Sequence, residues 1–135
     1  MYEFFEHTAD VGLRVRAPDL DRLFSEAATG LFALVVEGPL RLGPERRQFA
    51  VAGTRRDHLL FDWLNELLYV FDTERMLLGD FEARVSATGV CGSARGRLLD
   101  SERDRLLHEV KAITYHGLEV QRHADGWQAE LIVDI

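Results

Sequence analysis

The spacing of apolar residues changes at Met76, and this change constrains the fold more than any other feature of the sequence. Before it, two segments repeat apolar residues at helical spacing. After it, apolar and polar residues alternate, as they do in strands that bury one face. Two helices followed by a run of strands are typical of an α+β chain with a mostly antiparallel sheet.

Each predicted helix carries one apolar stripe. The first is expected to begin after Asp19, which suits an N-cap, and to end before Gly38 and Pro39. Its stripe comprises Leu20, Leu23, Phe24, Ala27, Leu31, Leu34 and Val35. The second is expected to begin at Thr54, because Asp57 three residues later resembles a capping box. Its stripe comprises Leu60, Trp63, Leu64, Leu67, Leu68 and Phe71.

Alternation and turn signals predict the strands. Three precede the second helix, over residues 1–6, 11–16 and 48–52. Five follow it, two of them over residues 109–115 and 118–122, and the dipeptide Asp125-Gly126 predicts a hairpin between the last two. We expect a single domain, residues 1–135, in which a curved, mostly antiparallel sheet carries the two amphipathic helices.

Composition restricts the setting and the partners. Cys91 is the only cysteine, which excludes an intrachain disulfide and favours a cytoplasmic protein. No apolar run approaches the ~20 residues that cross a bilayer, so we expect no membrane association. The net charge of −7 argues against stable direct nucleic-acid binding, which needs a basic surface, and suits a basic partner or a metal.

Two aspartates and the last residue predict an oxygen-rich site. Asp134 and the α-carboxylate of Ile135 end an alternating strand, and Asp10 lies near the other end of the chain. Both aspartates fall on the polar side of their strands. Neighbouring carboxylates repel unless a cation lies between them, and oxygen ligands suit Ca²⁺, Mg²⁺ or Mn²⁺. Alternatively, Asp10 caps a turn and Asp134 is a solvated strand end.

Lys111 is the only lysine among the 16 lysine and arginine residues. A position that keeps lysine where arginine is the rule can require a compact ammonium. The segment that it begins, residues 111–117, is either a polar contact for a phosphate or carboxylate, or an edge strand whose lysine discourages aggregation. His7 is either a ligand or acid–base group or, as we favour, a histidine bonded to backbone in a turn.

Together these segments resemble the archease family. The matching segments are His7-Thr8-Ala9-Asp10, the two amphipathic helices, residues 111–118 and the C-terminal Val133-Asp134-Ile135, in order over nearly the whole chain. The resemblance implies a non-enzymatic accessory protein with no catalytic residues of its own. Its partner would be an RtcB-type RNA ligase, which uses GTP and Mn²⁺ and whose guanylylation and multiple turnover in tRNA splicing it would promote.

The resemblance also implies which residues carry the function. It places a divalent cation, usually calcium with magnesium or manganese as alternatives, on Asp10, Asp134 and Ile135. It assigns the functionally important lysine of the family to Lys111. The acidic group and Lys111 are then expected to form one patch that meets the ligase near its nucleotide site.

Three alternatives stay open on the sequence. A metal-dependent hydrolase would use Asp10, His7 and Asp134 around a metal with an open coordination position. A general RNA-modification chaperone would bind several partners without a metal. In the third, the cation only stabilises the fold and a different face of the protein binds the ligase.

Overall fold

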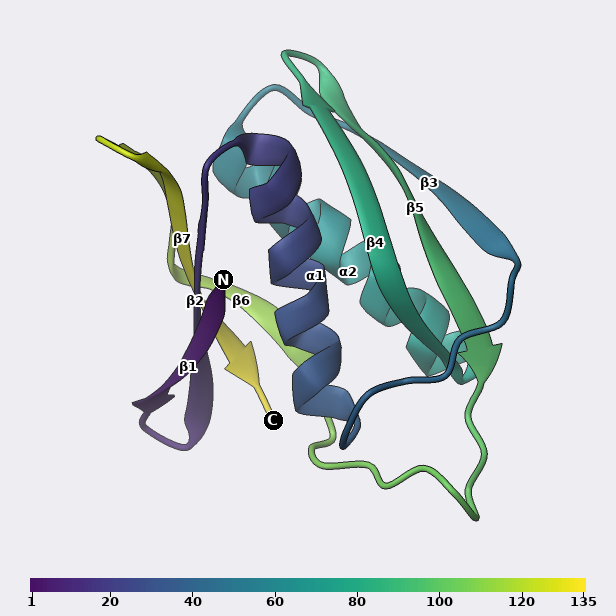
Figure 1. Ribbon diagram of the computed structural model, residues 1–135. Helices are drawn as coiled ribbons and strands as arrows, with labels where there is room; N and C mark the ends of the chain where they lie inside the picture. Colours follow the sequence, from purple (N-terminus) through teal and green to yellow (C-terminus); the bar gives the residue numbers. More distant parts are fainter.

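Nine helices and strands follow one another in the computed structural model, which describes all residues from 1 to 135 (Figure 1). In chain order they are β1 (Tyr2–His7), β2 (Asp10–Ala17), α1 (Leu20–Val35), β3 (Arg46–Ala52), α2 (Arg56–Glu74), β4 (Met76–Ser86), β5 (Gly89–Leu98), β6 (Ala112–His123) and β7 (Gly126–Asp134). Neither helix is long and apolar enough to cross a membrane.

The strands form two antiparallel sheets with the helices between them (Figure 1). One sheet has the order β1-β2-β7-β6 and the other β3-β5-β4. The predicted α+β class with two packed amphipathic helices is confirmed. The strands divide between two sheets because α1 buries apolar side chains on two sides. Gly30 lies against Leu13 of β2, whereas the Phe32 ring lies 5.7 Å from that of Phe81 in β4.

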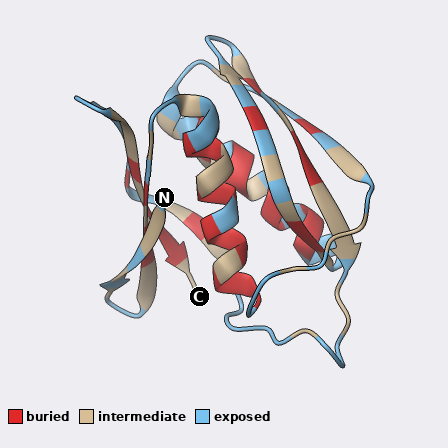
Figure 2. Cartoon of the chain, in the orientation of Figure 1, coloured by how far each residue is buried: buried red, intermediate tan, exposed pale blue.

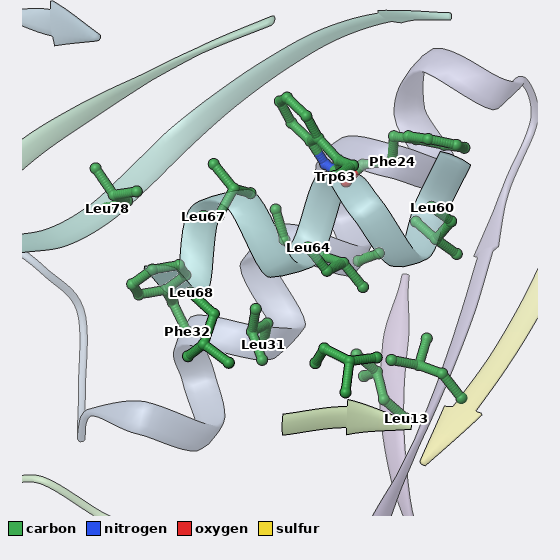
Figure 3. Close-up of a cluster of buried hydrophobic side chains, with 14 of the residues drawn as sticks. Leu13, Phe24, Leu31, Phe32, Leu60, Trp63, Leu64, Leu67, Leu68 and Leu78 are labelled. Atoms are coloured by element: carbon green, nitrogen blue, oxygen red, sulfur yellow. The ribbon is translucent and has the colours of Figure 1, made fainter. Parts of the chain in front are cut away.

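The hydrophobic core fills the space between the helices and the sheets, where the buried residues of Figure 2 gather. Trp63 of α2 is the largest fully buried side chain (Figure 3). Its indole N–H donates to the carbonyl of Phe24 at 3.1 Å, and its ring meets that of Phe49 edge to face at 6.2 Å. One side chain thus joins α2 to α1 and to the three-stranded sheet.

The two helices begin differently. Asp19 caps α1 as predicted, because its carboxylate accepts a hydrogen bond of 2.8 Å from the main-chain N–H of Arg22. The capping box predicted at Thr54 is wrong. Arg55 occupies the N-cap position of α2 without a side-chain bond, because the carboxylate of Asp57 turns to the N–H of the next residue instead.

Four strands follow α2, rather than the five that were predicted. The two segments expected around residue 116 belong to one strand, β6, whose pairing with β7 shifts between Thr114 and Glu119. Gly117, with φ of 67°, takes up the irregularity without reversing the chain. The Asp125-Gly126 hairpin is confirmed as the β6–β7 turn, where a Cβ on Gly126 would lie 2.3 Å from the carbonyl oxygen of Ala17.

An ion pair holds the long connection between β5 and β6. The Arg97 guanidinium donates to both carboxylate oxygens of Asp104, at 2.7 and 2.6 Å. The main-chain N–H of Asp100 donates to the same carboxylate, whose side chain is only 8% exposed. The Arg97 hydrogen bonds, followed by that main-chain bond, lower the pKa of Asp104 to about 2. This arrangement fixes the segment that leads to Lys111.

Acid is therefore expected to weaken this connection. Because folding lowers the pKa of Asp104 from 3.8 to about 2, its stabilisation is complete above pH 3.8 and is lost as the pH falls through about 2. We expect Asp104→Asn to unfold at a lower temperature than wild type at neutral pH. The difference between the two proteins should disappear across that acid window. A difference that stays constant down to pH 2 would contradict this assignment.

Candidate functional site

Asp10 and Asp134 meet at one end of the four-stranded sheet. β2 begins with Asp10 and β7 ends with Asp134. Asp10 pairs with His7 of β1, Asp134 pairs with Ala112 of β6, and the β2–β7 ladder reaches the residues immediately beside the two aspartates. The four strands thus place His7, Asp10, Asp134 and Ala112 in one row. Neighbouring Cβ atoms in such a row lie about 5 Å apart.

This row faces away from the helices. Val133 is fully buried in the core, and successive side chains of a strand point to opposite faces. Asp134 therefore points to the outer face, as does its row neighbour Asp10, whose side chain is 27% exposed. The two carboxylates are accessible to solvent and to a partner.

Neither aspartate has a lysine or arginine partner. The only basic group near Asp10 is the His7 imidazole, whose Nδ1 lies 3.9 Å from the carboxylate. Arg14, two rows away on the same face, is held by Glu3 at 3.0 Å and by Glu130 at 3.2 Å. The hydrogen bonds that the Arg14 guanidinium donates to Glu130 and then to Glu3 raise the pKa of Arg14. Its charge is thus already matched, and the charge of the aspartates is not.

Two buried polar atoms beside the aspartates have no hydrogen-bond partner. They are Nδ1 of His7 and Oγ1 of Thr114, which lies in the next row. The favoured interpretation of His7 as bonded to backbone in a turn is therefore wrong for this nitrogen. Buried polar atoms are normally satisfied by protein, water or an ion. The His116 ring, 6.1 Å from that of His7, borders the same place.

The donors at this end of the sheet fit a hard cation and do not fit zinc. No three His, Cys, Asp or Glu side chains gather within metal-binding reach anywhere in the chain. Asp10 and Asp134 supply two carboxylates, so a cation held here would need main-chain oxygens, a terminal carboxylate or water as its other ligands. Ca²⁺ and Mg²⁺ accept such oxygens, whereas structural zinc sites require four protein ligands. An open hollow of about 550 Å³ along residues 6–10 gives access to Asp10.

Lys111 lies at the same end of the sheet, on the other face. Its main-chain N–H donates to the carbonyl oxygen of Asp134 at 2.8 Å. Its side chain is exposed and lines a hollow of about 560 Å³ together with Phe71, Asp72 and Arg75 from the end of α2. Ile135, the last residue, packs its side chain against the core. Lys111 and the two aspartates thus flank the end of β7 from opposite sides.

Sequence reasoning missed Asp72, and it included Thr114 only as part of the polar segment 111–117. Asp72 shares the hollow of Lys111. Burial raises the pKa of Asp72, and the positive charge of Arg75 offsets only part of that increase. Thr114 contributes the unpartnered hydroxyl beside the aspartates. Nothing in the alternation of residues marks either one, because each acquires its role only through the pairing of distant segments.

Comparisons with known proteins agree over the whole chain. Residues 2–135 match the Archease protein family (MTH1598/TM1083). The chain is 36% identical to Protein archease of Pyrococcus abyssi over an alignment of 139 positions that covers 99% of this chain and 98% of that protein. It is also 36% identical to Protein archease of Methanopyrus kandleri, with 99% of each chain covered. The solution structure of Methanobacterium thermoautotrophicum protein 1598 superposes with a TM-score of 0.87 at 32% identity, covering 99% of this chain and 98% of that one.

Proposed function

Because this chain belongs to the archease family, we propose that it is a non-enzymatic activator of an RtcB-type RNA ligase. It promotes GTP-dependent guanylylation of the ligase and supports multiple turnover in tRNA splicing and RNA repair. The observation that supports this role is the end of β7, where two carboxylates without a lysine or arginine partner and the only lysine of the chain lie on opposite faces. A partner that binds around the end of β7 would contact both the two carboxylates and Lys111.

We include in the proposal a divalent cation, calcium first and magnesium or manganese as alternatives. Its protein ligands are the carboxylates of Asp10 and Asp134 and the α-carboxylate of Ile135. When bound, the ion neutralises the charge that the two aspartates leave unmatched and ties the start of β2 to the end of β7. The two residues come from strands that are adjacent in the sheet but more than a hundred positions apart in the sequence, so the ion fixes the contact surface.

Lys111 has a separate part in this proposal. Its ammonium carries three donors on a flexible stem, which suits a phosphate oxygen or a carboxylate in the ligase site. Asp72 and Arg75 share its hollow and set the charge around it. Because the main chain of Lys111 is bonded to Asp134, a cation that orders the end of β7 also orders the lysine.

The overall charge favours the same partner. The net charge of −7 would be attracted to a ligase groove that is basic because it binds RNA, and such attraction mainly accelerates association. The half-buried carboxylates of Asp10 and Asp134 would contribute to this attraction only while no cation is bound. Once a cation neutralises the two aspartates, this surface can enter the ligase groove without drawing metal ions away from the ligase.

A metal-dependent hydrolase is the second candidate, and one observation favours it. Nδ1 of His7 is unpartnered and lies 3.9 Å from the carboxylate of Asp10, where it could accept a proton from a metal-bound water. Turnover of a phosphate ester by the isolated protein with added metal would select this function. Activity only in the presence of the ligase selects the activator.

We expect Lys111→Ala to lose the stimulation of ligase guanylylation by about tenfold or more, the loss for one charge-assisted hydrogen bond to a phosphate. The measurement is the rate of covalent GMP transfer to the ligase from labelled GTP. Arg84→Ala is the matched control, because Arg84 is exposed on β4 and its loss removes the same charge. Equal stimulation by both variants would remove Lys111 from the mechanism.

A further inference from the structure

Two arginines lie beside Trp127 at the opposite end of β7 from Asp134. The guanidinium of Arg56, at the start of α2, lies 4.9 Å from the centre of the indole ring, and that of Arg122 in β6 lies 5.8 Å from it. A surface hollow of about 520 Å³ at this end of the sheet is lined by Trp127 and by one carboxylate, Asp125. Two elements thus bring two cations to one aromatic side chain. We refer to Arg56, Arg122 and Trp127 as the basic aromatic patch.

The cations of this patch lack acidic partners. Arg56 and Arg122 are exposed and form neither an ion pair nor a side-chain hydrogen bond. Most other arginines of the chain are paired with carboxylates, namely Arg14, Arg22, Arg46, Arg47, Arg55, Arg95, Arg97, Arg103 and Arg105. In a protein of net charge −7, unmatched cations gathered around one aromatic ring are not explained by solubility.

Another aromatic side chain, Tyr115, is exposed, but its surroundings have the wrong charge for an anionic ligand. The ring of Tyr115 stacks on that of Phe61 with 3.8 Å between the centres. Burial, followed by the charges of Asp62 and Asp57, raises the pKa of Tyr115. Acidic groups that disfavour a phenolate also repel a phosphate. An anionic ligand is therefore directed to the basic aromatic patch and away from Tyr115.

We propose that the basic aromatic patch is a contact site for single-stranded RNA. Guanidinium groups bind phosphate oxygens, and indole rings and guanidinium planes stack on unpaired bases. An acidic protein partner would match the charge, but it would leave the flat indole without a role. The choice of RNA over DNA rests on the proposed function, because the patch itself contains nothing that would read a 2′-hydroxyl.

The position of the patch makes RNA contact compatible with ligase contact. Trp127 and Asp134 are seven residues apart on β7, a span of about 23 Å in a strand. RNA held at Trp127 therefore leaves the end that carries Asp134 and Lys111 free for the ligase. Because the net charge of the protein is −7, the rest of the surface repels RNA and only the basic aromatic patch binds it. With so few phosphate contacts, the affinity is low and falls as salt is added.

The test measures binding of a labelled oligouridine of ~10 nucleotides to the isolated protein by fluorescence anisotropy. We expect binding at about 50 mM salt that weakens about sevenfold by about 200 mM, with a logarithmic slope near −1.4 for two phosphate contacts. The double variant Arg56→Gln/Arg122→Gln should weaken binding about tenfold and flatten the slope. Trp127→Leu keeps an apolar side chain but removes the flat ring, and it should weaken binding by a similar factor.

Arg84→Gln, which removes one charge from the other sheet, should bind like wild type. No measurable binding at low salt, or equal binding by wild type and the double variant, would overturn the proposal. It is also overturned if polyglutamate competes as well as oligouridine and Trp127→Leu has no effect, since the patch would then be a site for acidic protein. Because the ligase is absent, failure here leaves the activator role untouched, and failure of activation leaves this result untouched.

Discussion

Under the proposed function calcium stabilises this protein, and replacing Asp134 with asparagine is expected to remove most of that stabilisation. An ion present at about 100 times its dissociation constant raises the free energy of unfolding by about 2.7 kcal/mol. The variant loses one of two side-chain carboxylates and with it most of that effect. Without calcium the order should reverse, because wild type retains the repulsion between Asp10 and Asp134 and the variant does not. The measurement is the midpoint of thermal unfolding with calcium and with a chelator.

Two further proteins make this result specific. Asp62→Asn removes an equal charge from an exposed position of α2 and should respond to calcium like wild type. A short extension after Ile135 keeps both aspartates but displaces the terminal carboxylate, and it should weaken the calcium response. If wild type and Asp134→Asn respond equally, the cation site is absent. If Asp134→Asn loses the calcium response yet still activates the ligase, the cation only stabilises the fold.

Truncation of Trp63 to alanine is expected to cost about 3–5 kcal/mol of unfolding free energy, the range for large aromatic side chains removed from a packed core. The loss is large because the ring is fully buried between two helices and the three-stranded sheet. A Cβ on Gly92 of β5 would lie 2.5 Å from this ring, so the surrounding backbone already fits it closely. Chemical denaturation measures the change.

Trp63→Phe provides the graded control for this truncation. It retains an aromatic ring but removes the indole N–H that donates to Phe24. We expect a loss of about 1 kcal/mol from the hydrogen bond together with a smaller packing loss. A Trp63→Ala protein that is as stable as Trp63→Phe would show that the core closes around the missing ring and that Trp63 does not join its layers.

The helices were predictable because each one buries a stripe that repeats at helical spacing. Every residue of the stripe predicted for α2, from Leu60 to Phe71, is buried. The start of α2 was not predictable, since Asp57 can bond its neighbour as readily as it can complete a capping box with Thr54. The sequence predicted one curved sheet rather than two, because alternation indicates which face of a strand is buried but not which strands pair with it.

Only part of the candidate site was predictable, namely the face of the strand on which each aspartate lies. Alternation placed Asp10 and Asp134 on outer faces, and the sheet order β1-β2-β7-β6 makes them neighbours. The expectation that Lys111 joins them in one patch requires correction, because its side chain lines a hollow on the opposite face. One residue of strand register separates these outcomes. The patch around Trp127 depends on Arg56, which no local pattern connects to β7.

The most direct test of the activator role is multiple turnover by the RtcB-type ligase of the same organism. The ligase is limiting, broken RNA and GTP are in excess, and the protein is added or withheld. We expect product to exceed one equivalent of ligase only when the protein is present, and Lys111→Ala to abolish that excess while Arg84→Ala preserves it. A ligase that turns over equally well without the protein would contradict the proposed function.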